Sequence, residues 1–221
     1  MKKINYLILA ICATSILSSC INSPNCITGS GEIISNTRKT DTFENITING
    51  SCNVDINRGD SLSVIVSDYS NLIDMIETKV EKNELKISYK KGTCTKNSKI
   101  EIIITMPHIK GIEIKGSGSA NINGNFKEDI IYANISGSGD ISLKLTDTTA
   151  LLKSEINGSG TINAVNSVCD SAIAEVKGSG DINVSTIKYL KAKISGSGNI
   201  TYKGSPKTDI KIKGSGEVKQ K

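Results

Sequence analysis

A single tripeptide, Gly-Ser-Gly, recurs six times in the second half of this 221-residue chain. The copies begin at positions 116, 137, 158, 178, 196 and 214, so successive starts are 18 to 21 residues apart. A degenerate earlier copy is Gly50-Ser51-Cys52. Self-similarity at a nearly fixed period is the signature of a repeat architecture, in which each repeat stacks on its neighbours.

The residues around each triplet alternate between apolar and polar, as Ile114 and Ala120 show for the first copy. Alternation with a period of two predicts a β-strand with one buried face. Because Ile114 and Ala120 are six residues apart, the buried face continues through the triplet. We therefore expect Gly116 and Gly118 to point inward and Ser117 outward. Inward glycine would let the strand bend or another backbone approach.

These patterns predict an all-β solenoid with coils of about 18–21 residues, each with a Gly-Ser-Gly corner. Parallel strands of successive coils would stack about 4.8 Å apart. Ladders of Ile, Val and Ala would fill a thin interior, which suits a chain with 20 Gly, two Phe and no Trp. The alternative interpretation treats each triplet as a hairpin loop in an antiparallel meander.

The stretch between residues 57 and 110 is less regular. We expect strands at 62–66, 76–80, 85–89 and 100–105 and one helical turn within 68–75. No Pro- or Gly-rich linker separates this stretch from the repeats. We therefore expect a single solenoid domain over residues 31–221, with a less regular N-terminal half and repeat coils from about residue 111. Beyond Val218, Gln220 and its flanking lysines suit a polar edge that resists further strand pairing.

Residues 1–19 have the features of a lipoprotein signal peptide. Two lysines precede an apolar run over residues 6–16, which is short for a membrane span. The run ends in Leu17-Ser18-Ser19-Cys20, which resembles a bacterial lipobox. We expect Cys20 to carry fatty acids such as palmitate, with residues 20–30 as a membrane tether. An ordinary secretory signal is the alternative.

The residues next to Cys20 bear on which membrane would hold this lipid anchor. Ile21 is not the Asp associated with inner-membrane retention in some bacteria, so we expect the outer membrane of the cell envelope. No acidic run follows Cys20 to favour surface export, and both the periplasmic and the external face stay open.

Four cysteines remain once Cys12 and Cys20 are set aside, at positions 26, 52, 94 and 169. Disulfides are common in exported proteins, and four cysteines allow three pairings. We favour Cys52–Cys94, because both lie at turn-like positions of the N-terminal half, and four free thiols are the alternative. The cysteine spacing matches no zinc motif, so no metal site is expected.

Composition excludes several functions. The net charge is only +5, two of the 27 basic residues are Arg, and aromatic residues make up 4% of the chain. Bidentate base contacts and stacking platforms are therefore missing, which argues against nucleic-acid binding. A single His leaves little room for metal or triad chemistry, and we expect no cofactor. The pattern carries no signature of a particular oligomeric state.

Several strings match a known family pattern: Phe43-Glu44-Asn45-Ile46, Ile48-Asn49-Gly50-Ser51, Leu85-Lys86-Ile87-Ser88-Tyr89, residues 102–107, and Gly158-Ser159-Gly160-Thr161-Ile162-Asn163. On these residues the chain resembles the putative auto-transporter adhesin, head GIN domain family of bacterial exported lipoproteins, from about Gly31 to the C-terminus. The resemblance implies a right-handed parallel β-helix-like fold and an adhesin role. It implies no set of catalytic residues.

The outward columns of the expected coils hold the candidate site residues. Stacking would place Glu155 beside Glu175, either as an acid/base pair or calcium site or as part of a solvated ladder in which Glu175 meets Lys193. Ser159 and Ser179 belong to a column of corner hydroxyls that would be able to contact sugars. Two further candidates are weaker, Asp140 and Asp181 for calcium, and His108, which we interpret as a surface histidine.

Two function classes follow, with a third held open. We expect a lipid-anchored adhesin-like module whose non-catalytic surface binds a glycan or protein ligand, with the membrane as its other partner. The alternative is a carbohydrate-active β-helix enzyme, a lyase or hydrolase, that uses the stacked carboxylates. The third is a purely structural envelope protein.

Overall fold

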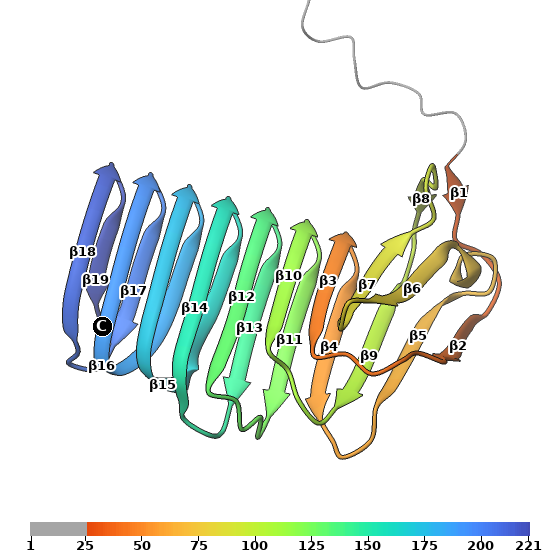
Figure 1. Cartoon of the computed structure of the whole chain (residues 1–221). Coiled ribbons are helices and arrows are strands. Elements are labelled where there is room, and N and C mark those ends of the chain that lie inside the picture. Colours follow the sequence, from red (N-terminus) through yellow and green to blue (C-terminus); the bar gives the residue numbers. More distant parts are fainter. Residues whose placement is uncertain (1–25) are drawn as a thin grey trace, which may run out of the picture.

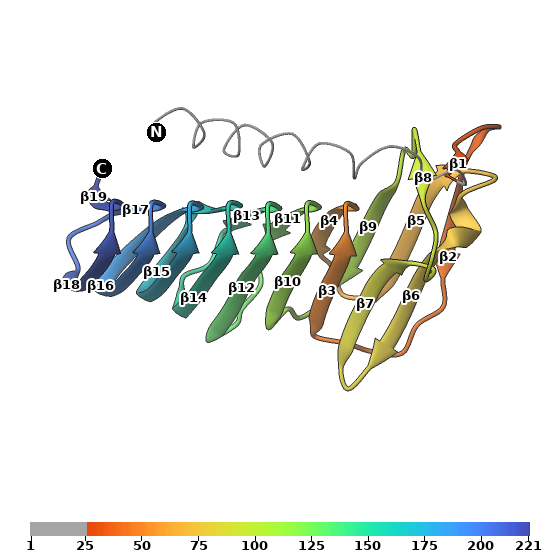
Figure 2. The ribbon, with the colours of Figure 1, turned by 90° about the horizontal axis from the view of Figure 1, so that it is seen from above.

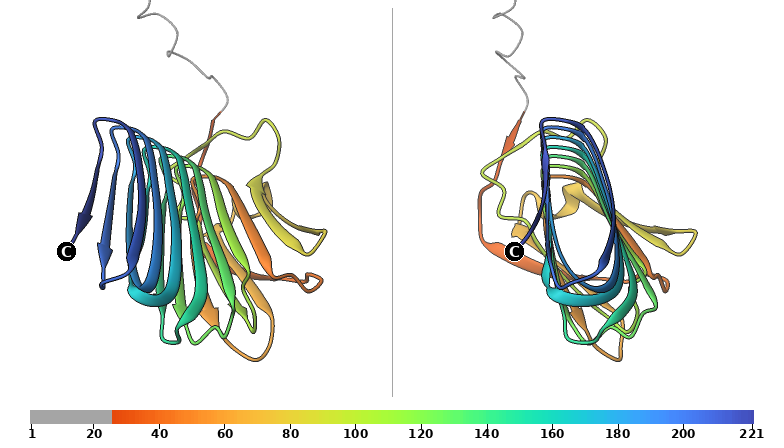
Figure 3. Two further views of the ribbon diagram at one scale, coloured as in Figure 1. Left: turned by 60° about the vertical axis from the view of Figure 1, so that its left-hand side comes forward. Right: turned by 90° about the vertical axis from the view of Figure 1, so that its left-hand side faces the viewer.

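The computed structural model describes residues 26–221, which form an all-β solenoid of stacked parallel coils (Figure 1). Each coil runs along one side, turns at Gly-Ser-Gly and returns along the other. Seen along its axis, the solenoid is a flattened oval closed by two sheets (Figure 3). This architecture confirms the predicted all-β solenoid. No helix within residues 26–221 is long and apolar enough to cross a membrane.

The leading sheet contains the strands that precede each corner. In spatial order these are β7 (Glu84–Tyr89), β3 (Asn45–Gly50), β10 (Gly111–Gly116), β12 (Ile130–Gly137), β14 (Thr149–Gly158), the second halves of β15 (Thr161–Gly178) and β16 (Asp181–Gly196), and β18 (Lys207–Gly214). Figure 2 shows this order. All these pairs are parallel and one coil apart, so the hairpin meander is wrong.

The trailing sheet contains the strands that follow each corner. These are β9 (Glu101–Met106), β4 (Asn53–Arg58), β11 (Ser119–Gly124), β13 (Asp140–Leu145), the first halves of β15 and β16, β17 (Asn199–Lys203) and β19 (Glu217–Gln220). Identical repeat positions pair across every coil, for example Ile141 with Ile162 and Ile162 with Ile182. The predicted stacking of apolar residues into ladders is therefore confirmed.

The N-terminal region closes one end of the stack with antiparallel strands. β5 (Ser63–Tyr69) pairs with β9 and with β2 (Ile33–Arg38), and β6 (Ile76–Glu81) pairs with β7. The turn η1 (Ile73–Met75) lies between β5 and β6, and the short strand β1 (Ile27–Thr28) pairs with β8 (Thr95–Lys96). The four strands and the helical turn expected here are present within a few residues of their predicted bounds.

The first coil, β3 and β4, lies between two pairs of strands that come later in the sequence. β3 pairs with both β7 and β10, and β4 pairs with both β9 and β11. The chain therefore builds one coil, leaves to make the N-terminal end, and returns to continue on the other side.

The interior consists of two apolar ladders, as the alternation predicts. The side chains two residues before each triplet are fully buried from Ile114 to Ile194, and those two residues after it are 0–1% exposed from Ala120 to Ile200. Larger side chains close the N-terminal end, among them Phe43, Leu72 and Met106.

The glycines of the corners make room for the backbone of the neighbouring coil. Gly116 has φ +139°, and a Cβ there would lie 2.5 Å from the carbonyl oxygen of Gly50. A Cβ on Gly118 would lie 2.5 Å from the carbonyl oxygen of Cys52. The expected close approach of another backbone is present, but it comes from the stacked coil and not from the interior. The serine between them, Ser117, is exposed as expected.

The predicted Cys52–Cys94 disulfide is wrong, because Cys94 is bonded to Cys26. This bond ties β1 to β8, where the Ile27 amide donates to the Cys94 carbonyl at 2.8 Å. Cys52 forms no disulfide, since its side chain turns into the core, where burial and then Asp68 raise its thiol pKa to about 12. Cys169 is also buried without a disulfide. Cys20 and the signal peptide lie outside the described residues.

Candidate functional site

The two outer faces of the solenoid carry different chemistry. The leading face presents mainly charged side chains, with the column Glu113, Asn134, Glu155, Glu175, Lys193 and Lys211 in register across six coils. The trailing face presents mainly amides and hydroxyls. The outward positions of both faces repeat once per coil. Each face therefore offers the same kind of contact many times along the solenoid axis.

Glu155 and Glu175 are paired in register on the leading face, as predicted. Lys177 Nζ lies 2.7 Å from Glu155 Oε1 and 3.4 Å from Glu175 Oε1, and Lys193 Nζ lies 2.8 Å from Glu175 Oε1. Hydrogen bonding from Lys193 is the largest of the effects that hold the pKa of Glu175 below its ordinary value. An acid/base pair needs one carboxyl pKa raised. The geometry is therefore that of the solvated ladder, including the expected Glu175–Lys193 contact.

The trailing face carries two adjacent outward columns, which we call the amide–hydroxyl face. From β4 to β17 its members are Asn53, Ser119, Asp140, Thr161, Asp181 and Asn199 in one column and Asp55, Asn121, Ser142, Asn163, Asn183 and Thr201 in the other. On β19 the columns continue to Glu217 and Lys219. None of the twelve is a Lys or Arg, and all are exposed or half-buried. The face therefore combines hydrogen-bond donors and acceptors without a cation.

Hydrogen bonds between coils hold several of these side chains in place. The Ser119 hydroxyl donates to Asn53 Oδ1 at 2.8 Å, and Asn121 Nδ2 donates to Asp55 Oδ1 at 2.9 Å. Asn199 Nδ2 donates to Asp181 Oδ1 at 2.9 Å. These contacts use part of the hydrogen-bonding capacity of each group, and carboxylate and amide oxygens still have free lone pairs for a ligand.

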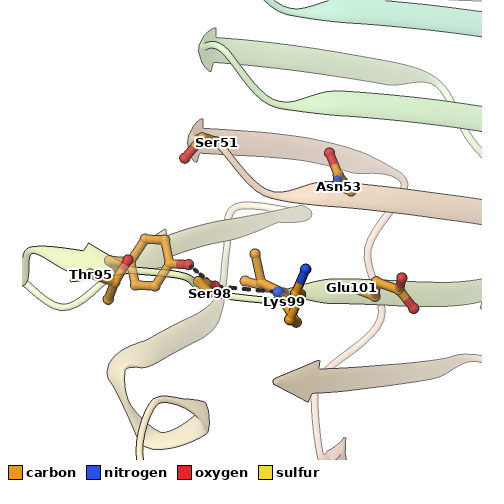
Figure 4. A pocket seen from close by; sticks show the side chains of 8 residues that line it. Ser51, Asn53, Thr95, Ser98, Lys99 and Glu101 are labelled. Atoms are coloured by element: carbon orange, nitrogen blue, oxygen red, sulfur yellow. Dashed lines mark hydrogen bonds between the residues drawn. The ribbon is translucent and has the colours of Figure 1, made fainter. Parts of the chain in front are cut away.

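A hollow of about 450 Å³ lies at the N-terminal end of this face (Figure 4). Its lining is Ser51, Asn53, Tyr89, Thr95, Ser98, Lys99, Ile100 and Glu101. Asn53 belongs to both the hollow and the amide–hydroxyl face, and Glu101 pairs with Asn53 in the sheet. The column that contains Asn53 therefore runs into a concave site that also offers one lysine and one aromatic ring, whereas the Asp55 column continues to the exposed Ile103.

The buried carboxylate of Asp68 fixes the segment that lines the hollow. It accepts hydrogen bonds from the Ser98 hydroxyl at 2.7 Å and from the Lys99 amide at 2.8 Å. Ser98 also lies 3.0 Å from the Tyr89 hydroxyl, and burial is the largest effect raising the phenol pKa of Tyr89. The hollow therefore presents a neutral tyrosine beside a segment that Asp68 holds by hydrogen bonds. This site was not predicted from the sequence, although an Asp in step with the buried Val64 and Val66 was a usable signal.

The other predicted residues lie outside the hollow. Ser159 and Ser179 are exposed at the corner, as expected for that column. Asp140 and Asp181 follow their corners in a single column of the trailing face, and His108 Nδ1 lies 2.9 Å from Glu128 Oε1. Within residues 26–221 no group of three or more His, Cys, Asp or Glu side chains is arranged to hold a metal ion.

Comparison with known proteins identifies relatives of the whole solenoid. A family model described as "putative auto-transporter adhesin, head GIN domain" matches residues 42–153 and 143–206. A putative adhesin from Bacteroides fragilis NCTC 9343 has a similar structure, with a TM-score of 0.72 and 25% identity over 88% of this chain and 100% of that one. No curated protein matches the chain.

Two structures from Parabacteroides distasonis ATCC 8503 share the fold. One is described as a putative adhesin, with a TM-score of 0.60 and 21% identity over 89% of this chain and 100% of that one. The other is described as a putative lipid binding protein, with a TM-score of 0.56, 24% identity and the same coverage.

Proposed function

The chain belongs to the putative auto-transporter adhesin, head GIN domain family, and on that premise we propose that it is a lipid-anchored, non-catalytic binding module of the bacterial cell envelope. In this proposal Cys20 carries the lipid and the outer membrane holds the anchor. The tether expected over residues 20–30 ends before Cys26, because the Cys26–Cys94 bond and the pairing of β1 with β8 attach residues 26–28 to the solenoid. The Cys26–Cys94 disulfide supports export, because such bonds are rare in the reducing cytosol.

The ligand we propose is an extended, neutral glycan that lies along the amide–hydroxyl face and ends in the hollow beside Tyr89. The observation that carries this proposal is the continuous row of amides, hydroxyls and carboxylates from β17 to the hollow, free of Lys and Arg over twelve positions. Sugars present closely spaced hydroxyls that both donate and accept, which matches side chains of this kind. A protein ligand fits less well, because protein interfaces depend on Trp, Tyr and Arg anchors.

Repetition would supply the affinity that single contacts lack. Coils follow one another at about 4.8 Å, so a polymer with a short repeat meets equivalent side chains on successive coils. Linked weak contacts act at a high effective concentration and reinforce one another. Binding should therefore strengthen with glycan length until the polymer spans the face.

The decisive experiment is titration of the protein with neutral polysaccharides and with oligosaccharides of increasing length, selected on a glycan array. The variant Asn121→Ala/Asn163→Ala/Asn183→Ala removes three amides from the face, and we expect it to weaken binding at least tenfold. The matched control, Ser136→Ala/Asn157→Ala/Ser195→Ala, removes three small polar groups from the leading face and should bind normally. Equal weakening in both variants would contradict the assignment of the face.

The same purified protein and glycans also distinguish the alternative functions from the proposed one. Cleavage of a polysaccharide that disappears in Glu155→Gln/Glu175→Gln would establish the carbohydrate-active enzyme instead. Binding to matrix proteins but to no glycan would establish a protein ligand. For the anchor, metabolic labelling with palmitate should mark the wild-type chain, and a label that persists in Cys20→Ala would contradict lipidation at that residue.

A further inference from the structure

Within the described residues, the coil formed by β18 and β19 leaves its apolar ladder open. Ile212 is 43% exposed, whereas Ile194 at the same position of the preceding coil is fully buried. Likewise, Ile210 is 42% exposed and its counterpart Ala192 is 1% exposed. Among the described strands β18 pairs only with β16, so its other edge carries unpaired backbone groups (Figure 1). Such an edge is a template for a further strand. The polar edge expected beyond Val218 belongs to β19 of the trailing sheet, not to β18.

This edge is also strongly basic. Residues 203–221 contain six Lys against two acidic residues, a balance of +4. Lys207, Lys211 and Lys213 stand on β18 and form no ion pair within the described residues, whereas Lys177 and Lys193 of the preceding coils pair with glutamates. The exposed edge therefore concentrates positive charge.

The register of the leading face shows what the next position should carry. Glu175 pairs with Lys193 in the ladder, and Lys193 is followed by Lys211. Two lysines side by side are unfavourable, and a carboxylate beside them is favourable. A strand laid along β18 with acidic residues opposite Lys211 and Lys213 would continue the pattern of ion pairs already present between coils.

We propose that β18 is the docking edge for an extended segment of a partner protein in which apolar and acidic residues alternate. The segment would add to the leading sheet as one more strand, with main-chain hydrogen bonds to the free edge of β18. Its apolar side chains would cover Ile210 and Ile212, and its acidic side chains would lie beside Lys211 and Lys213. This site is separate from the amide–hydroxyl face and does not depend on the glycan proposal.

A second copy of the chain fits this edge poorly. Two copies that met through their last coils would bring two surfaces of +4 together. A head-to-tail contact would place β18 against β6, where the exposed Lys79 stands between Glu77 and Glu81 and would meet the lysines of β18. Of the two carboxylates, Glu81 already pairs with Lys79 and Lys86. A second copy and a separate partner protein would both be able to bury Ile210 and Ile212 and to form main-chain hydrogen bonds with β18. The charge of the edge therefore favours an acidic partner.

The test measures binding of a fluorescent ten-residue peptide that alternates Glu with Val to the full chain by anisotropy. We expect saturable binding that weakens with salt, together with slower amide exchange over residues 207–214. The double charge reversal Lys211→Glu/Lys213→Glu should weaken binding at least tenfold. The matched control, Lys127→Glu/Lys144→Glu, reverses two exposed lysines elsewhere and should leave affinity within twofold.

Three results would overturn the proposal. One is failure of the peptide to bind. Another is equal binding of the same peptide with alternate amides N-methylated, which would show charge attraction without strand addition. The third is sedimentation of the chain alone as a dimer that Lys211→Glu/Lys213→Glu dissociates, which would assign the edge to a second copy.

Discussion

The repeat coils and the N-terminal region both contribute strands to the two sheets, but their strands pair in different ways. From β10 to β19 every strand pairs in parallel with the equivalent strand of the next coil in sequence. In the N-terminal region the strands pair out of order, and β2, β5 and β6 are antiparallel to their partners. A disulfide and larger apolar side chains accompany the irregular part, while glycine corners accompany the regular one.

The difference shows that a stack and its end have different physical requirements. Inside the stack each coil is covered by its neighbours, so small residues suffice and the corner must admit the next backbone. At the end of the stack no coil follows, and the apolar ladder must be covered by other elements. The N-terminal region supplies such a cover, whereas Ile210 and Ile212 at the opposite end remain exposed.

The largest effect should come from a methyl group at a stacked corner. Gly158 has φ +142°, and a Cβ there would collide with the carbonyl of Gly137. We expect Gly158→Ala to destabilise the fold by roughly 1–3 kcal/mol through backbone strain and by about 1–3 kcal/mol more through overpacking. Urea unfolding of the purified variant measures the loss.

Gly50 provides the matched control at the degenerate corner. It has φ +109°, but nothing lies within 4 Å of a Cβ built there. Gly50→Ala should therefore show only the strain, roughly 1–3 kcal/mol. Equal losses in the two variants would mean that backbone conformation alone, and not the approach of the next coil, selects glycine.

The next largest effect concerns the N-terminal end. Cys26 and Cys94 are 68 residues apart, and removal of their bond by Cys26→Ser/Cys94→Ser should destabilise the protein by about 2–4 kcal/mol. The amides that lose protection from exchange should lie in β1, β8 and their surroundings, with the repeat coils unchanged. Dithiothreitol should lower wild-type stability by the same amount and leave the double variant unaffected. A further loss in the reduced double variant would indicate a second disulfide.

Much of the fold follows from local pattern. The parity of Ile114 and Ala120 around one triplet is enough to define the buried face, because a strand has a fixed period of two. The same parity places Glu155 beside Glu175 once the coils are taken to stack in register. Repetition makes this kind of prediction dependable, since one correct coil specifies the others.

The parts that escaped prediction all depend on contacts between distant segments. The pairing of Cys26 with Cys94 requires β1 to lie beside β8, and no periodicity records that contact. The hollow depends on Asp68 reaching Ser98 across 30 residues of sequence. Phe126 lies in the segment between β11 and β12, where the alternation is interrupted, and is fully buried. Residues of this kind occur once in the sequence, so no repeated pattern indicates the long-range structure that depends on them.

A smaller effect, a gain in stability, is expected where a polar side chain interrupts a buried apolar ladder. Ser154 is buried between Ala133 and Ala174, and its hydroxyl has no hydrogen-bond partner. Ser154→Ala should stabilise the protein by about 1 kcal/mol, because an unsatisfied buried hydroxyl is unfavourable. The matched control is Ser185→Ala, whose hydroxyl donates to the Val165 carbonyl at 2.7 Å and whose loss should destabilise by about 1 kcal/mol. Two losses of similar size would imply that Ser154 is satisfied after all.

The smallest effect concerns the ion pairs that cross between coils on the leading face. The Glu175 pKa is lowered in the folded protein, chiefly by hydrogen bonding from Lys193. Its stabilising contribution is therefore complete above the unfolded carboxyl pKa and is lost as the pH falls through the folded value. Glu175→Gln should lower stability by less than about 1 kcal/mol at pH 7, and less still at high salt.

Urea midpoints for wild type and Glu175→Gln, measured from pH 7 down to pH 3, give the sign directly. The two curves should converge as the pH falls, because protonated Glu175 and Gln no longer differ in charge. A wild-type protein that instead gained stability relative to the variant on acidification would show that Glu155 and Glu175 repel each other. One of the two carboxyls would then have a raised pKa, and the leading face would regain the property that an acid/base pair requires.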